Sequence, residues 1–321
     1  MMFDNIHSES YDQLHTLTTG FSSLAQGGHT VTFTLYDEAG NTDSETWTFN
    51  KDTQPPTTPV ISCTNYPENT WVTLDDPTFT WTASSDPTPG SGVAGYNYRL
   101  VSGIFIDTQS RTKTYSNLDD GIHTFEVKAY DAVSNYGSLD TYTIKIDDTP
   151  PNSPNPDDSV SGWSSDNTPT FTWAPISDTS EITGYWYAVD DSSPESGGTW
   201  ITTTTVTLSA QAEGSHTFYV KAKNGAGLLS TYGSHAFSID TSVPGTPSPD
   251  DGVTGWSDEN NPTFTWNAIT DTSGITGYWY AVDNSAPESG GTWTTSTFVT
   301  LTSQSDGSHR FYVKAKNGAG L

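Results

Sequence analysis

The sequence predicts an all-β protein, built as a tandem array of antiparallel β-sandwiches that are joined by proline-rich linkers. The first observation is a repeat, because the string "PTFTW" occurs at 77–81, 169–173 and 262–266, spaced 92 and 93 residues apart. The second is an alternation of apolar and polar residues within short segments, which is typical of half-buried strands. The third is that no long segment shows helical periodicity.

A second marker keeps the same period. A histidine follows a glycine-containing turn at His29, His123, His216 and His309, spaced 94, 93 and 93 residues apart. Proline-rich stretches such as "DDTPPNSPNP" separate the units, and prolines favour extended, semi-rigid connections. We therefore expect the C-terminal part of a repeat at 1–52, whole repeats at 53–148 and 149–241, and a repeat without its last strand at 242–321.

The strands within a repeat follow from the alternation. In "HTFEVKAYD", the apolar residues Phe125, Val127 and Ala129 share one parity, and polar residues occupy the other. Turns such as "DGIH" and "EGSH" separate the strands. About six or seven short strands per repeat, without a helix, predict an antiparallel sandwich. Its core is expected to contain the inward aromatic residues, which are Phe79, Trp81, Tyr96 and Phe125 in one repeat and Phe171, Trp173, Tyr185 and Phe218 in the next.

The motifs recur in a fixed order: a proline-rich entry, "PTFTW", the pattern "GYxY" of "GYWYAVD", and the pattern "HxFxVxA" of "HTFYVKAK". In this order they resemble the immunoglobulin-like or fibronectin-III-like repeats of large bacterial and archaeal surface proteins, over essentially the whole chain. The resemblance implies immunoglobulin-like β-sandwiches with these three strings on strands B, C and F. The chain departs from it in lacking the cysteine pair of antibody domains. In addition, Asp37 and Asp131 become Asn224 and Asn317 in the later repeats, so a calcium ligand at this position cannot be general.

Composition excludes several classes of function. The 321 residues include 38 acidic and 11 basic residues, for a net charge of −27, so the chain is not expected to bind nucleic acid or anionic membranes. No apolar run approaches the length of a membrane span. The single cysteine, Cys63, excludes an intrachain disulfide framework but not an extracellular location. No "GxSxG", "HExxH" or phosphate-loop motif occurs, so we do not expect an enzyme.

One aromatic residue of strand C is predicted to face outward. Trp186 has the opposite parity to its inward neighbours Tyr185 and Tyr187, and Trp279 is its equivalent in the last repeat. On the adjacent strand F, each tryptophan is expected near a tyrosine or a lysine. The candidate ligand or packing patch is Trp186, Tyr219, Trp279 and Tyr312. It could be a surface ladder of rings and lysine stems, or a patch that stacks on glycans or packs against other chains.

The charged residues suggest three further expectations. The scarce basic residues cluster on the predicted F strands, where they are expected to pair with carboxylates such as Asp190 and Asp283. One histidine per repeat cannot assemble a zinc site, so the histidines are expected to be structural. The acidic linkers are either solvated or bind calcium between domains, so no cofactor is certain and calcium is the one candidate. The candidate calcium ligands are Asp147, Asp148, Asp157, Asp158, Asp240, Asp250 and Asp251.

The expected function is that of a non-catalytic extracellular or cell-surface structural protein, such as a stalk, a fibre or a surface layer. The alternatives are an adhesin or carbohydrate-binding segment that uses the outward aromatics, and accessory domains of a secreted enzyme. Expected partners are neighbouring copies of the chain, other cell-surface proteins, or glycans. The last repeat stops at "KNGAGL", which indicates either a piece of a longer array or an end open to strand addition by the next subunit.

Overall fold

The computed structural model describes residues 21–321, which form two compact units divided between Ile146 and Asp147. The part of the first predicted segment at residues 1–20 lies outside the described residues. Within residues 21–321, the helical turns are η1 (Phe21–Ser23) and η2 (Pro194–Ser196), and the other elements are strands. The all-β prediction is confirmed. In the same range no helix is both long enough and apolar enough to span a bilayer.

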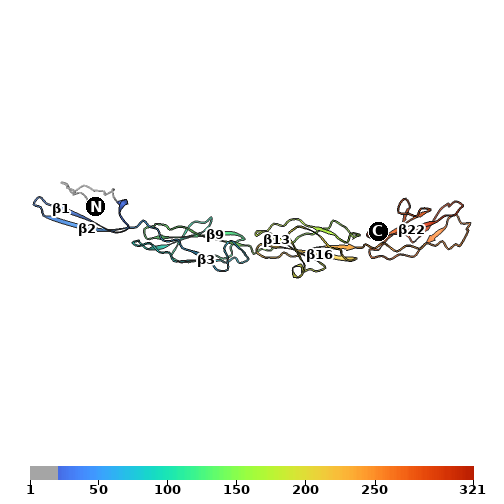
Figure 1. The fold of residues 1–321 in the computed structure, drawn as a ribbon, viewed down its shortest axis with the longest axis horizontal. Coiled ribbons are helices and arrows are strands. Elements are labelled where there is room, and N and C mark those ends of the chain that lie inside the picture. Colours follow the sequence, from blue (N-terminus) through green and yellow to red (C-terminus); the bar gives the residue numbers. More distant parts are fainter. Residues whose placement is uncertain (1–20) are drawn as a thin grey trace. The chain divides into compact units, whose positions relative to one another are not determined.

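The first unit contains a long hairpin followed by a complete sandwich. The hairpin joins β1 (Gly27–Tyr36) to β2 (Thr42–Lys51) in antiparallel register (Figure 1). The sandwich has one sheet in the order β3-β5-β8 and a second in the order β4-β10-β9-β6-β7. Its strands are β3 (Ile61–Cys63), β4 (Trp71–Val72), β5 (Thr78–Trp81), β6 (Val93–Leu100), β7 (Ile106–Thr108), β8 (Thr112–Thr114), β9 (Gly121–Asp131) and β10 (Asp140–Ile146).

The second unit contains two further sandwiches of the same design. In the first, β13 and β16 lie side by side at the centre of the sheet β11-β17-β16-β13-β14, and β12 pairs with β15 (Figure 1). In the second, the sheets are β20-β19-β22 and β18-β21. The strands of the first are β11 (Trp163–Ser164), β12 (Thr170–Thr172), β13 (Ile182–Val189), β14 (Thr199–Ile201), β15 (Thr205–Thr207), β16 (Gly214–Asn224) and β17 (Gly233–Ile239). Those of the second are β18 (Thr263–Thr265), β19 (Ile275–Val282), β20 (Thr292–Thr294), β21 (Phe298–Thr300) and β22 (Phe311–Asn317).

Each core is centred on two phenylalanines that stack between the sheets. Phe79 stacks on Phe125 with ring centroids 4.3 Å apart, and Phe171 stacks on Phe218 at 4.2 Å. All four rings are fully buried. The other predicted core residues are also buried, which confirms the inward parity of strands B, C and F; these residues are Trp81, Tyr96, Trp173 and Tyr185.

The last sandwich is more open than the other two. Phe264 and Phe311 stack at 4.2 Å, but both are only half-buried. In the preceding sandwich, β11 lies parallel to β17, which keeps Trp163 half-buried. The described residues of the last sandwich include no strand equivalent to β17, and Trp256, which corresponds to Trp163, is 89% exposed.

Candidate functional site

Paired tryptophans lie on the outward face of strands C and C′ in the last two sandwiches. Trp186 in β13 lies opposite Trp200 in β14, with ring centroids 5.2 Å apart and an interplanar angle of 59°. Trp279 in β19 lies opposite Trp293 in β20, at 5.1 Å and 63°. Cross-strand aromatic pairs of this kind stabilise a sheet by roughly 0.2–1 kcal/mol each.

The sandwich of the first unit has a polar pair at the same place. Asn97 in β6 lies opposite Asp107 in β7, and Asn97 Nδ2 donates to Asp107 Oδ1 at 3.2 Å. Both members of the pair therefore change together between repeats. This sandwich provides an internal comparison for any role of the tryptophans.

A glycine makes room for the second tryptophan of each pair. A Cβ at Gly184 would lie 2.4 Å from Trp200 Cζ2, and one at Gly277 would lie 2.3 Å from Trp293 Cζ2. The indole rings therefore pack directly against the strand C backbone. Trp200 and Trp293 remain 36% exposed, so part of each ring is accessible to a flat ligand.

The predicted tyrosine partners lie two residues along the strand from the positions opposite the tryptophans. In the register between β13 and β16, Lys221 lies opposite Trp186, and Tyr219 lies opposite Ala188. The Tyr219 ring contacts Tyr232 instead, with centroids 5.2 Å apart. Tyr312 likewise lies opposite Ala281 rather than Trp279. The structure thus brings Trp186 and Trp279 against a second tryptophan that sequence reasoning missed. This second tryptophan is the last residue of the repeated string "GYWYAVD…GGTW". A hairpin folds the two ends of the string together, so the two tryptophans lie opposite each other.

The strand F lysines beside the tryptophans are held by glutamates. Lys221 Nζ donates to Glu195 Oε1 at 2.7 Å, and Lys314 Nζ donates to Glu288 Oε1 at 3.0 Å. The hydrogen bond from Lys221 lowers the pKa of Glu195. These carboxylates replace the predicted partners, Asp190 and Asp283, which bind histidines.

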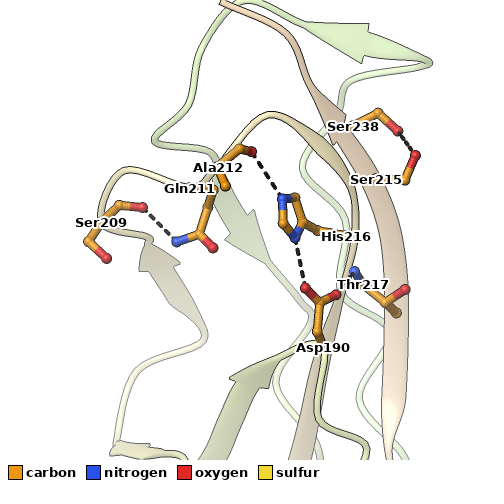
Figure 2. Close-up of polar contacts among 8 residues, drawn as sticks. All are labelled: Asp190, Ser209, Gln211, Ala212, Ser215, His216, Thr217 and Ser238. Carbon is orange, nitrogen blue, oxygen red and sulfur yellow. Dashed lines mark hydrogen bonds and ion pairs between the residues drawn. The ribbon is translucent and has the colours of Figure 1, made fainter. Parts of the chain in front are cut away.

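The histidine near the start of strand F has a structural role, as predicted. His216 Nε2 donates to the Ala212 carbonyl at 3.0 Å, and Nδ1 donates to Asp190 Oδ2 at 2.7 Å (Figure 2). Asp190 Oδ1 also accepts the Thr217 backbone N–H at 2.8 Å. Because both ring nitrogens face acceptors, the site fits the imidazolium form, and the hydrogen bond to Asp190 raises the pKa of His216. His309 repeats the arrangement with Asp283 at 2.8 Å.

The predicted calcium ligands do not converge on one another as a set. Asp147 and Asp240 are fully buried, and each accepts a hydrogen bond from an asparagine amide. Asp250 and Asp251 accept backbone N–H groups of their own turn. Of the predicted set within residues 21–321, Asp157 and Asp158 meet in a cluster of three potential metal ligands, and the third is His235. His235 Nε2 lies 3.1 Å from Asp158 Oδ1, and its Nδ1 lies 3.9 Å from Asp157 Oδ1.

A second acidic cluster was not predicted. One carboxylate oxygen from each of Asp52, Asp86 and Asp131 lies within 4.8 Å of the other two. These residues come from the linker after β2, the segment between β5 and β6, and the end of β9. The three residues are far apart in the sequence, so the sequence does not show that they meet. The exchange of Asp131 for asparagine in later repeats indicated only that this position differs between repeats.

The sheet topology identifies the type of sandwich. Strand C′ pairs with strand C in the sheet that also contains F and G, as β7 does in the first unit and β14 in the second. The other sheet contains strands A, B and E, as in β3-β5-β8. The chain is a tandem array of fibronectin-III-like domains. The part of it that the structure describes consists of these domains and the β1–β2 hairpin, without a catalytic domain.

Comparison with known proteins gives two curated relatives and distant structural neighbours. No family model matches the chain. Chitinase A1 of Niallia circulans is 32% identical over 195 residues, which are 59% of this chain and 26% of that protein. Endoglucanase B of Cellulomonas fimi is 30% identical over 270 residues, which are 78% of this chain and 25% of that protein. The chain thus spans about a quarter of the length of each relative.

Two solved structures align with much of the array at low identity. The FN1–FN3 domains of chicken CNTN1 are 17% identical with a TM-score of 0.28, covering 83% of this chain and 95% of that one. The fibronectin(III)-like modules of Clostridium thermocellum CbhA are 13% identical with a TM-score of 0.29, covering 56% and 93%. The fold assignment therefore rests on the strand order of the fibronectin-III-like domains themselves.

Proposed function

We propose that the chain is a non-catalytic array of accessory domains within a secreted polysaccharide-degrading protein. The observation that carries the proposal is the identity of 32% and 30% to two proteins named as a chitinase and an endoglucanase. Both alignments cover most of this chain but only a quarter of each relative. That is the pattern expected when accessory domains are shared and catalytic domains lie elsewhere.

The physical character of the domains supports this role. Each of the two complete sandwiches closes its own aromatic core, so these domains do not need disulfides, and Cys63 is a free, buried cysteine. Proline-rich linkers favour extended, semi-rigid connections between them. A net charge of −27 favours solubility outside the cell. In this proposal the domains act as spacers, which takes the place of the stalk, fibre or surface layer that the sequence first suggested.

The test is to find what the chain is attached to and where it is located. An antibody against residues 53–321 would be used on culture medium and on washed cell envelopes of the producing organism. We expect the antigen in the medium, on a polypeptide that clears carboxymethylcellulose or glycol chitin in a zymogram. An antigen confined to the envelope, on a band without hydrolytic activity, would support the structural alternative instead.

A second candidate function is contact with polysaccharide through the paired tryptophans. It is favoured by the exposed rings of Trp200 and Trp293, each packed against a second indole on an outward face. In this proposal, the flat apolar faces of a neutral sugar chain stack on the exposed rings. Lateral packing between copies of the chain is the competing use of the same surface.

Sedimentation with insoluble cellulose and chitin would test the binding role. We expect the wild-type chain to sediment with one of the two polymers and a Trp200→Ala, Trp293→Ala variant to remain in solution. Trp47→Ala is the matched control, because Trp47 is 65% exposed on the β1–β2 hairpin and outside the paired face. Equal sedimentation of all three proteins would rule out a specific role for the pairs. Self-association that disappears in the double variant would instead assign the face to lateral packing.

A further inference from the structure

The residue after the last strand of a repeat is an aspartate, and its carboxylate accepts a hydrogen bond from the following repeat. Asp52, Asp147 and Asp240 each follow such a strand, namely β2, β10 and β17. Each carboxylate accepts the backbone N–H of the equivalent serine before strand C. The distances are 2.7 Å from Ser91, 3.1 Å from Ser180 and 3.0 Å from Ser273.

In the second unit, an asparagine amide meets this linker carboxylate. Asn224 Nδ2 donates to Asp147 Oδ2 at 3.0 Å, and Asn317 Nδ2 donates to Asp240 Oδ2 at 3.1 Å. Both asparagines end strand F and are 1% exposed. A neutral hydrogen-bond donor thus faces the buried negative charge at both places, as buried charges require.

In the first unit the same position of strand F is Asp131, which is also 1% exposed. Its Oδ1 accepts the backbone N–H groups of Val133 and Asn135, and its Oδ2 accepts Asn135 Nδ2 at 2.7 Å. Asp131 thus accepts hydrogen bonds from its own turn. The asparagine donor of the other repeats is therefore replaced by a second carboxylate, which lies beside Asp52.

The third carboxylate points to a missing partner independently. Asp86 Oδ2 accepts the Gly92 N–H at 2.6 Å, whereas Asp86 Oδ1 is buried and meets no donor among the described residues. None of the ion pairs within residues 21–321 involves Asp52, Asp86 or Asp131. A buried carboxylate oxygen without a donor is costly unless a cation or a water binds it.

We propose that Asp52, Asp86 and Asp131 bind one calcium ion at the start of the repeat 53–148. Calcium binds oxygen ligands at about 2.3–2.6 Å, so oxygens on opposite sides of one ion lie roughly 4.8 Å apart. The three carboxylate oxygens lie within 4.8 Å of one another, which fits a shared ion. The calcium ion replaces the asparagine amide of the other repeats and holds Asp52 against the loop before strand C and the end of strand F.

This inference does not depend on the proposed function. It also places calcium away from the acidic residues that the sequence suggested. Asp147 and Asp240 already face asparagine donors, whereas Asp52 faces carboxylates. The exchange of one side chain at the end of strand F thus decides whether a linker aspartate needs a cation.

Calorimetric titration of the chelator-treated full chain with CaCl2 would test the site. We expect one equivalent of Ca²⁺ for the wild type, and at least a tenfold loss of affinity in Asp131→Asn. This variant should fold, because asparagine occupies the same position in the other two repeats; near-UV circular dichroism would check it. Asp158→Asn is the matched control, since it alters the other acidic cluster, and it should still bind one equivalent.

Hydrogen exchange provides a second readout of location. Calcium should slow exchange in residues 86–92 and 131–135 of the wild type and of Asp158→Asn, but not of Asp131→Asn. The reverse change, Asn224→Asp, should add a second equivalent of Ca²⁺ in the second unit. The absence of saturable binding to the wild type, or unchanged binding by Asp131→Asn, would overturn the proposal. Failure of Asn224→Asp to gain an equivalent would overturn the claim that this strand F position decides binding.

Discussion

Truncation of the strand B tryptophan should destabilise one sandwich and leave the stability of its neighbours unchanged. Trp173 is 6% exposed, and its ring contacts Tyr185 at 5.2 Å and Phe218 at 6.2 Å. Replacing a buried aromatic residue with alanine costs about 3–5 kcal/mol, because transfer free energy is lost and a cavity remains. For a domain of this size, that cost lowers the melting temperature by at least about 12 °C.

The same change in the last sandwich provides a comparison. Trp266 is also 6% exposed and contacts Tyr278 and Phe311 at 5.3 and 6.1 Å. However, Phe311 is half-buried, whereas Phe218 is fully buried. A more open core collapses or hydrates more easily around a cavity, so Trp266→Ala should lie near the lower end of the range, about 3 kcal/mol.

Peptide-resolved hydrogen exchange is the appropriate assay, because a chain of several domains does not unfold in one two-state step. In Trp173→Ala, the slowest amides of β16 should exchange roughly a hundredfold faster or more, since every 1.4 kcal/mol is a factor of ten. The amides of β9 should not change. The outward Trp200→Ala should cost only about 0.2–1 kcal/mol. If β16 exchanged at the wild-type rate in Trp173→Ala, the assignment of the inward face would be refuted.

Three other predictions follow from local contacts. Asp190 raises the pKa of His216, so the stability that this pair adds to its domain is complete below the ordinary histidine pKa of about 6.5 and declines as the pH rises through the higher folded value. In calorimetric scans across neutral pH, a His216→Gln variant should lose this decline in the melting of that domain, whereas His123→Gln should keep it. Gly184→Ala should destabilise its domain by roughly 1–3 kcal/mol and change the fluorescence of Trp200, because the new Cβ would overlap that ring; unchanged melting and fluorescence would contradict the packing. Burial raises the pKa of the Cys63 thiol to about 11, so the native protein should not react with a thiol reagent at pH 8 until it is unfolded, and rapid reaction of the folded chain would show that the thiol is accessible.

Much of the fold could be predicted from the sequence, because the signals that specify it are local. The direction of a side chain alternates along a strand, so the parity of Phe125 and Val127 alone indicated that they face the core. The same argument placed Tyr185 inward and Trp186 outward. The period of the repeat identified the equivalent strands, and the glycine-containing turns separated them. The phenylalanines of both fully buried pairs were therefore recognisable as core residues from the sequence alone.

The candidate sites depended on contacts between strands and loops, which parity does not specify. The register between β13 and β14 pairs Trp186 with Trp200, because the turn between them sets which residues lie opposite each other. The three carboxylates of Asp52, Asp86 and Asp131 meet only because the linker, the loop before strand C and the end of strand F converge. The sequence determined which faces are apolar and which positions differ between repeats, whereas only the tertiary structure decided which of these side chains meet, since long-range proximity depends on the path of the whole chain.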